Sequence, residues 1–117
     1  MKKAMIVSIL LCVFISNVWL LSAKSVTPVD IFITPNPMDK HTTITVNFTQ
    51  ATNVGVNVET AEGIVIKTLY WGPADEQLVL TWNRLSDDGY YVPSGSYVVV
   101  VNYQSRYTST KKTLILK

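Results

Sequence analysis

Alternation of apolar and polar side chains with a period of two dominates the sequence from Val26 onward. In the stretch HTTITVNFT at 41–49, Ile44, Val46 and Phe48 fall on one face of an extended chain, and polar residues fall on the other. Such alternation over a short segment indicates a half-buried β-strand, and no comparable stripe with helical spacing follows it. The pattern therefore restricts the folded part of the chain to an all-β architecture.

The same pattern recurs in short segments that are separated by turn signals. Seven segments are predicted to be strands, at 29–34, 41–49, 54–60, 64–71, 77–82, 96–103 and 112–117. Glu62–Gly63 indicates a tight hairpin, because glycine adopts the positive φ that such turns require. The stretch from Trp71 to Asp75 predicts a longer loop. About seven short strands at this spacing predict a β-sandwich of the immunoglobulin or fibronectin type III kind.

The first 23 residues have the organisation of an export signal. Two lysines precede an apolar run over 4–21, and Ser22–Ala23 supplies the small residues that a signal peptidase requires. We expect a signal helix that is removed after Ala23. The apolar run also approaches the roughly 20 residues that span a bilayer, so an uncleaved membrane anchor is the alternative.

The remaining chain has room for one folded domain. We expect residues 24–32 to form a short tail and the entry to the first strand, and residues 33–117 to form the sandwich. Removal of residues 1–23 takes away two of the ten Lys and Arg residues, which leaves eight basic against eight acidic side chains and no cysteine. Apolar burial without disulfides must then stabilise the domain. Without a basic surface, nucleic acid is not an expected partner.

Two stretches resemble a known family. Residues 33–48, ITPNPMDKHTTITVNF, resemble the entry to small C-terminal domains of exported bacterial proteins, through Pro35, Asn36 and Pro37. Residues 82–97, WNRLSDDGYYVPSGSY, resemble a strand, turn and strand of the immunoglobulin-like domain of the flagellar hook-capping protein and of the related type IX secretion C-terminal domains. The positions that carry this second resemblance are Trp82, Gly89, Val92, Gly95 and Tyr97.

The resemblance extends over residues 33–117, since EGIVIKTL at 62–69 and the final KKTLILK resemble a hairpin and the last strand of the same family. It implies an exported immunoglobulin-like domain. The export signal and the absence of the flagellar protein's other segments argue against a hook-capping role. Three positions depart from the family pattern: Asn83, Arg84 and Ser86 stand where Asp, Gly and Asp are usual. These departures argue against a carboxylate cluster that binds a cation.

Residue types that carry catalysis or bind metals are sparse. Asp87 and Asp88 could be considered as calcium ligands, but two adjacent carboxylates supply too few oxygens, so a turn-forming role is expected. His41 is the only histidine, and no nucleophile motif accompanies it. We therefore expect no catalytic, cofactor-binding or metal-binding residue, no cofactor and no enzymatic activity.

The aromatic residues and the final lysines are the candidate contact residues. Trp82 and Tyr97 occupy inward-facing positions, and four other aromatic residues are expected in or beside loops: Trp71, Tyr90, Tyr91 and Tyr107. Such rings stack on sugars or anchor a protein partner, or else they cover the ends of the sandwich. Lys111, Lys112 and Lys117 are interpreted as a solvated strand face or as protection of a strand edge. By the resemblance, they could instead belong to the end that a secretion machinery reads.

The sequence thus predicts an exported, non-enzymatic module with a structural or protein-interaction role at the bacterial cell envelope. The expected location is the periplasm, the outer-membrane surface or the extracellular space, and membrane contact is expected only through an uncleaved N-terminal segment. The expected partner is a protein or an envelope component, and pairing of a partner strand with an open sheet edge is one possible mode. The alternatives are a type IX secretion-type sorting or attachment domain and a small carbohydrate-binding module.

Overall fold

The computed structural model describes residues 29–103 and 108–117. These residues form seven strands, β1 (Asp30–Thr34), β2 (Thr42–Asn47), β3 (Thr52–Glu59), β4 (Val65–Ala74), β5 (Gln77–Trp82), β6 (Gly95–Tyr103) and β7 (Thr108–Leu116). Within these two ranges there is no helix, and hence none long and apolar enough to cross a bilayer. The expected signal helix over 1–23, most of the tail and Tyr107 lie outside the described residues.

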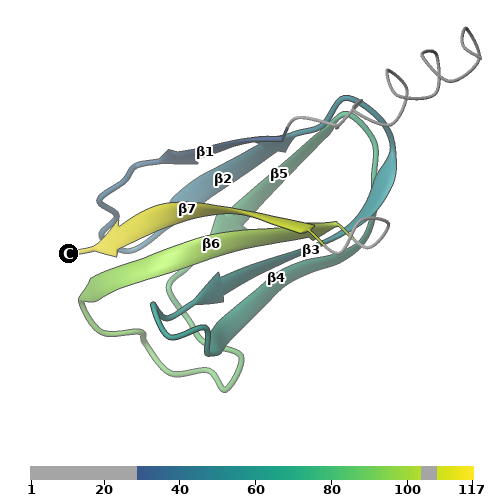
Figure 1. The fold of residues 1–117 in the computed structure, drawn as a ribbon. Coiled ribbons are helices and arrows are strands. Elements are labelled where there is room, and N and C mark those ends of the chain that lie inside the picture. The colour runs from purple at the N-terminus through teal and green to yellow at the C-terminus, as the bar shows by residue number, and fades with distance from the viewer. Residues whose placement is uncertain (1–28, 104–107) are drawn as a thin grey trace, which may run out of the picture.

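The strands form two antiparallel sheets that pack face to face, as Figure 1 shows. One sheet has the order β1-β2-β5 and the other the order β4-β3-β6-β7. The predicted all-β sandwich of seven strands is therefore confirmed. Because β4 pairs with β3, the four-stranded sheet does not have the composition of an immunoglobulin constant domain, in which the fourth strand lies beside the fifth.

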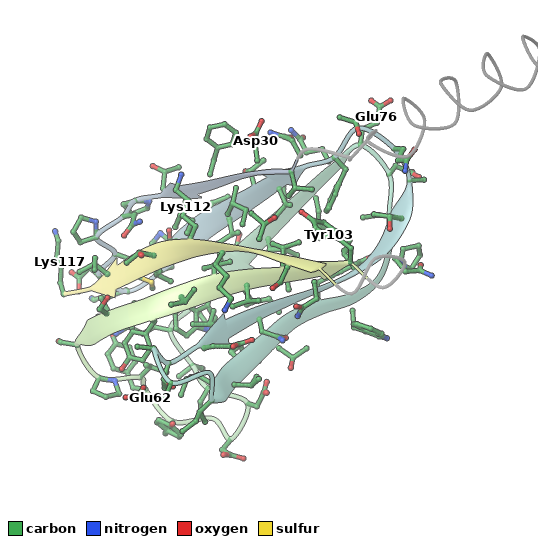
Figure 2. The ribbon with its side chains drawn as sticks, in the orientation of Figure 1. Asp30, Glu62, Glu76, Tyr103, Lys112 and Lys117 are labelled. Carbon is green, nitrogen blue, oxygen red and sulfur yellow. The ribbon has the colours of Figure 1, made fainter. Side chains whose placement is uncertain are left out.

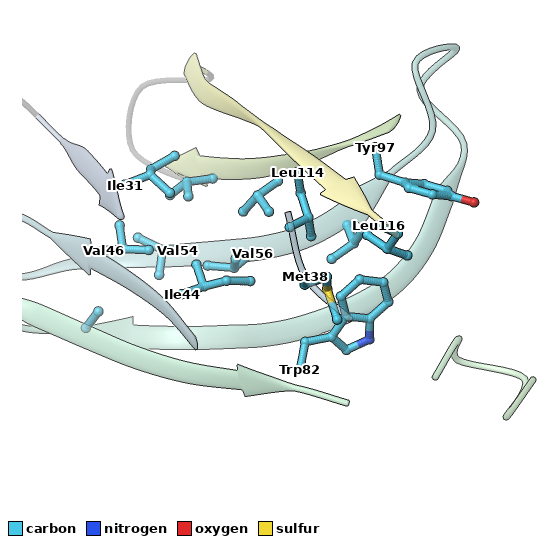
Figure 3. Close-up of a cluster of buried hydrophobic side chains, with 14 of the residues drawn as sticks. Ile31, Met38, Ile44, Val46, Val54, Val56, Trp82, Tyr97, Leu114 and Leu116 are labelled. Carbon is cyan, nitrogen blue, oxygen red and sulfur yellow. The ribbon is translucent and has the colours of Figure 1, made fainter. Parts of the chain in front are cut away.

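The core follows directly from the alternation in the sequence. On β2, Ile44 and Val46 are fully buried, while the intervening Thr45 is half-buried. At one end of the core, Trp82 lies beside Met38 and Leu116 (Figure 3). The buried cluster comprises Ile31, Met38, Ile44, Val46, Phe48, Val54, Val56, Val58, Ala74, Trp82, Val92, Tyr97, Val99, Val101, Leu114 and Leu116.

The predicted loop from Trp71 to Asp75 is wrong over 71–74, because β4 continues to Ala74, and only Asp75 of this stretch lies outside a strand. Residues 71–74 pair with the first half of β3, where Gly55 lies opposite Trp71 and Asn53 opposite Pro73. Proline is tolerated here because β4 is an edge strand, in which one side makes no ladder hydrogen bonds. The local Gly-Pro signal was therefore overridden by pairing with a distant strand.

Two further differences concern strand ends and regularity. The last strand begins at Thr108 rather than at residue 112, and it pairs along the full length of β6. The β3–β4 pairing contains register shifts after Val56 and after Val58. The predicted hairpin between these strands is present, with Gly63 N–H donating to Thr60 O at 3.0 Å and Thr60 N–H donating to Ile64 O at 2.9 Å.

Candidate functional site

The segment between β5 and β6, residues 83–94, forms a turn that we call the corner segment. Its turn is closed by hydrogen bonds from Gly89 N–H to Ser86 O (3.0 Å) and from Ser86 N–H to Tyr90 O (2.9 Å). Gly89 has a φ of 87°, which glycine adopts without the steric cost that other residues incur. Trp82 Nε1 donates to Leu85 O at 2.9 Å, so the start of the segment is attached to a buried ring. The corner segment is therefore a fixed part of the sandwich.

Arg84 lies near the start of this segment and connects it to the rest of the domain. It is buried, with only 3% of its surface exposed. Its guanidinium donates to three main-chain oxygens: Nε to Val92 O (2.8 Å), Nη1 to Asp39 O (2.6 Å) and Nη2 to Lys117 O (2.8 Å). The five donors of an arginine in a fixed plane suit such a set of acceptors. Arg84 thus joins the β1–β2 connection, the corner segment and the end of β7.

In the sequence, Arg84 stands out only as a departure from a family glycine. The structure shows that it keeps the backbone conformation that glycine favours, with a φ of 67°, which is uncommon for a residue with a side chain. The replacement of the family glycine was therefore the sequence feature that could have indicated a structural role for Arg84. Its partners Asp39 and Lys117 are 45 and 33 residues away in the sequence, and no local pattern indicates them.

Tyr90 and Tyr91 stand in the corner segment and are 50% and 53% exposed. The Arg84 guanidinium lies 4.7 Å from the centre of the Tyr91 ring, a distance at which a cation is attracted to an aromatic face. Tyr90 is fixed through its backbone, because its N–H donates to Ser86 Oγ at 3.2 Å. The Tyr91 ring is therefore supported by a side-chain contact, and the Tyr90 ring extends from a backbone that hydrogen bonds fix. Tyr97 is different, since it is buried and its hydroxyl donates to Pro93 O at 2.8 Å.

Asp87 contacts the edge of β4. Its carboxylate accepts from Thr68 N–H, at 3.2 Å to each oxygen, and its own N–H donates to Ile66 O at 3.0 Å. Lys67 Nζ lies 3.7 Å from the same carboxylate. Asp87 is therefore engaged with a strand edge. Across residues 29–103 and 108–117, no three His, Cys, Asp or Glu side chains are grouped so that they could hold a metal ion.

Trp71 lies on β4, so the expectation that it stands in or beside a loop is corrected. Its ring crosses Gly55 on β3, where an added Cβ would come within 2.7 Å of Trp71 Cε3. The indole is nevertheless 65% exposed, which leaves one face open. Trp71 contacts Gly55 of β3, whereas Tyr91 contacts Arg84 of the corner segment, so these aromatic residues are supported by different elements.

The Asn-Pro motif has a structural role at the edge of β7. Asn36 Nδ2 donates to Thr113 O and Asn36 Oδ1 accepts from Ile115 N–H, both at 2.9 Å. Its side-chain amide thereby makes the hydrogen bonds to β7 that the backbone of a neighbouring strand would otherwise make. The flanking residues Pro35 and Pro37 are exposed and are preceded by cis peptide bonds.

The three lysines at the end of the chain have different surroundings. Lys112 extends from β7 towards β1 (Figure 2), where its Nζ donates to Ile31 O at 3.0 Å and lies 5.8 Å from the centre of the Phe32 ring. Lys111 lies on the same strand, and its side chain is exposed, as is that of Lys117. Lys112 therefore contacts a strand edge, whereas the other two present their charges to solvent.

Comparisons with known proteins agree with this architecture. The model of the FlgD Ig-like domain matches residues 35–106. A solved structure of dimeric latent PorU from Porphyromonas gingivalis matches 79% of this chain with 18% sequence identity and a TM-score of 0.64. PorZ of the same organism, described as an essential bacterial surface component of its type-IX secretion system, matches 74% with 22% identity and a TM-score of 0.49.

These likenesses are partial in one respect. The chain spans 9% of the length of the PorU chain and 11% of the length of the PorZ chain. The match to PorU therefore concerns a small part of that protein. A comparison with curated proteins gives no significant match.

Proposed function

This chain belongs to the family of FlgD Ig-like domains, and we propose that it is an exported, non-enzymatic module that makes a protein contact at the bacterial cell envelope. The export signal predicted in residues 1–23 supports the extracytoplasmic location. The fold similarity to a domain of PorU is consistent with such a location. The expected partner is a protein or another envelope component.

The observation that carries this proposal is the presentation of Tyr90 and Tyr91 by the corner segment. Exposed aromatic rings on a rigid support are typical anchors of protein interfaces, because binding them costs little conformational entropy. Arg84 holds Tyr91, and the turn closed at Gly89 holds Tyr90. The two half-exposed rings therefore form the contact surface of this proposal.

Site-specific photo-crosslinking in cells tests this proposal on the full chain. A photoreactive phenylalanine analogue at position 90 is expected to give a discrete adduct with a second protein, and Tyr91→Ala in the same chain is expected to reduce its yield several-fold. The matched control places the analogue at Lys111, which is exposed on β7. If position 90 gives no adduct, or if both positions give the same adducts, the corner segment is not the contact surface.

A sorting or attachment role in a type IX-type secretion system is the second candidate. The fold similarity to PorU favours it, and β7 would be the strand that the machinery reads. Deleting KKTLILK is an unsuitable test, because Leu114 and Leu116 are 0% and 2% exposed and their loss would unfold the domain. Replacing exposed Lys111 and Lys117 by serine preserves the core. Export that is unchanged by this double substitution argues against the sorting role.

A carbohydrate-binding role rests on Trp71, whose exposed indole lies across Gly55 of the neighbouring strand. A ring in this setting suits stacking against a sugar. Binding to an array of bacterial glycans, lost in Trp71→Ala and kept in Tyr91→Ala, would support this role. An array without signal would remove it.

A further inference from the structure

Each sheet ends in two edge strands, which are β1 and β5 in one sheet and β4 and β7 in the other. An edge strand presents unpaired N–H and C=O groups that readily pair with another strand, so proteins usually obstruct their edges. Three of the four edges of this sandwich are hydrogen-bonded by residues from elsewhere in the described chain, and the fourth is not. This difference identifies an interaction surface.

Three edges carry an obstruction. On β7, Asn36 bonds to Thr113 and Ile115, and Met38 continues this contact with Ile115 O at 2.8 Å. On β4, the Asp87 carboxylate accepts a hydrogen bond from Thr68 N–H, and Asp87 N–H donates to Ile66 O. On β1, Lys112 Nζ donates a hydrogen bond to Ile31 O. Each obstruction comes from a residue distant in sequence.

The hydrogen bonding of β2 with β5 shows which groups of β5 face outward. Phe48 N–H donates to Glu76 O at 2.8 Å, one position beyond the last pair of the ladder. Hydrogen-bonded and non-hydrogen-bonded pairs alternate between antiparallel strands, so the even-numbered residues of β5 bond to β2 and the odd-numbered ones face away. The outward main-chain groups belong to Gln77, Val79 and Thr81. No residue within the described ranges makes a hydrogen bond to them.

The side chains of β5 do not protect this edge. Its sequence, QLVLTW, has no charge and no proline, and its pairing with β2 has no bulge. Val79 is 57% exposed, and Gln77 and Thr81 are exposed on either side of it. The strand therefore lacks the usual features that prevent edge-to-edge pairing.

We propose that the β5 edge pairs with β5 of a second copy of this chain, antiparallel and around a two-fold axis at Val79. In this register Val79 lies opposite Val79 of the second copy, Gln77 opposite Thr81, and Leu78 opposite Leu80. The apolar side chains meet apolar side chains, the polar ones meet polar ones, and no charge is brought close to its copy. The two three-stranded sheets become one continuous sheet.

The backbone selects the same register. All outward groups belong to odd-numbered residues, and an axis at Val79 matches all three of them with odd-numbered residues of the second copy. Each of these pairs exchanges two backbone hydrogen bonds. An axis at Leu78 or Leu80 leaves one of the three outward residues of each copy without a partner on β5. The surface is separate from Tyr90 and Tyr91, so the inference is independent of the proposed function.

Disulfide trapping of the full chain tests this pairing, in a background in which Cys12→Ser removes the native thiol. Opposed residues of a hydrogen-bonded pair have Cα atoms about 5.5 Å apart, which a disulfide can bridge. Val79→Cys is therefore expected to give a disulfide-linked homodimer when cells are treated with a mild oxidant. Thr45→Cys is the matched control on the same sheet face, because three strand spacings, about 14 Å, would separate it from its copy.

The register has its own test. Co-expression of a Gln77→Cys chain with a Thr81→Cys chain is expected to give a crosslinked dimer, while either chain alone gives at least several-fold less. In the proposed register, Gln77 lies about 13 Å from its own copy, beyond the reach of a disulfide. Dimers from Gln77→Cys alone that equal those of the mixture would overturn the register. A monomeric Val79→Cys chain, or one linked mainly to a different protein, would overturn the pairing of two copies.

A non-covalent measurement excludes an effect of the thiols. The full chain in detergent is expected to behave as a dimer by light scattering, and Val79→Lys is expected to shift it towards the monomer by placing two like charges together. Thr45→Lys adds the same charge to the same face without reaching the axis, and it is expected to leave the dimer intact. Equal behaviour of these two variants would contradict the proposal.

Discussion

The guanidinium of Arg84 lies 4.7 Å from the ring centre of Tyr91, and its Nη2 donates to Lys117 O at 2.8 Å. A buried cation thus supports an exposed aromatic ring. The hydrogen bond to Lys117 also joins the corner segment to the end of the last strand. This relation links the stability of the domain to the surface that we propose for partner binding.

Removing the guanidinium is expected to destabilise the domain. In Arg84→Ala, three main-chain oxygens lose their donor, and we expect the free energy of unfolding to fall by about 2–4 kcal/mol. Arg84→Gly loses the same bonds, but glycine adopts the φ of 67° without strain, so it should be about 1 kcal/mol more stable than the alanine variant. Urea denaturation measures both. Alanine and arginine share the cost of the positive φ, so an alanine variant as stable as the natural protein would show that the guanidinium contributes nothing.

The two tryptophans are expected to differ in their contribution to stability. Trp82 is 1% exposed and lies in the core, so Trp82→Ala should lower the free energy of unfolding by about 3–5 kcal/mol. Trp71 is 65% exposed, and Trp71→Ala should cost about 1 kcal/mol or less. Chemical denaturation followed by circular dichroism compares them. A loss below about 1 kcal/mol for Trp82→Ala would contradict its role in the core.

Asn36 is expected to protect the edge of β7. Asn36→Ala removes the bonds to Thr113 and Ile115, at a cost of about 1–2 kcal/mol, and it should accelerate hydrogen exchange at the Ile115 amide. Asn36→Asp keeps the acceptor for that amide but loses the donor to Thr113, so protection of Ile115 should largely remain. Hydrogen exchange followed by NMR separates the two variants. Equal exchange at Ile115 in both would contradict the assigned bonds.

Tyr103 makes stability depend on pH in the alkaline range. Burial raises the pKa of its hydroxyl above the ordinary value of 10.0, and the hydrogen bond with Thr110 lowers this pKa only in part. As the pH rises through about 10, the unfolded chain loses this proton before the folded chain does, so stability falls. Tyr103→Phe lacks this loss. Its stability relative to the natural protein should therefore improve from about pH 9 to about pH 11, as denaturation at each pH would show.

How well a structural feature of this protein can be predicted from the sequence depends on how far apart in the sequence the interacting residues lie. The strands, the hairpin at Gly63 and the burial of Trp82 follow from alternation and turn residues, which act over a few positions. The strand character of Gly72–Ala74 was missed because Gly72 and Pro73 signal a loop locally. Pairing with Thr52–Val54 of β3 decided that stretch instead.

By itself the sequence determined the all-β class, the inward face of most strands and the turn around Gly89. The tertiary structure alone decided what the polar residues contact: Asn36 on β7, Asp87 on β4, Lys112 on β1 and Arg84 at three main-chain oxygens. It also decided that no residue within 29–103 and 108–117 hydrogen-bonds to the outward main-chain groups of β5. The physical reason is that hydrophobic burial depends on the local period, whereas each of these hydrogen bonds joins residues that only the packing of two sheets brings together.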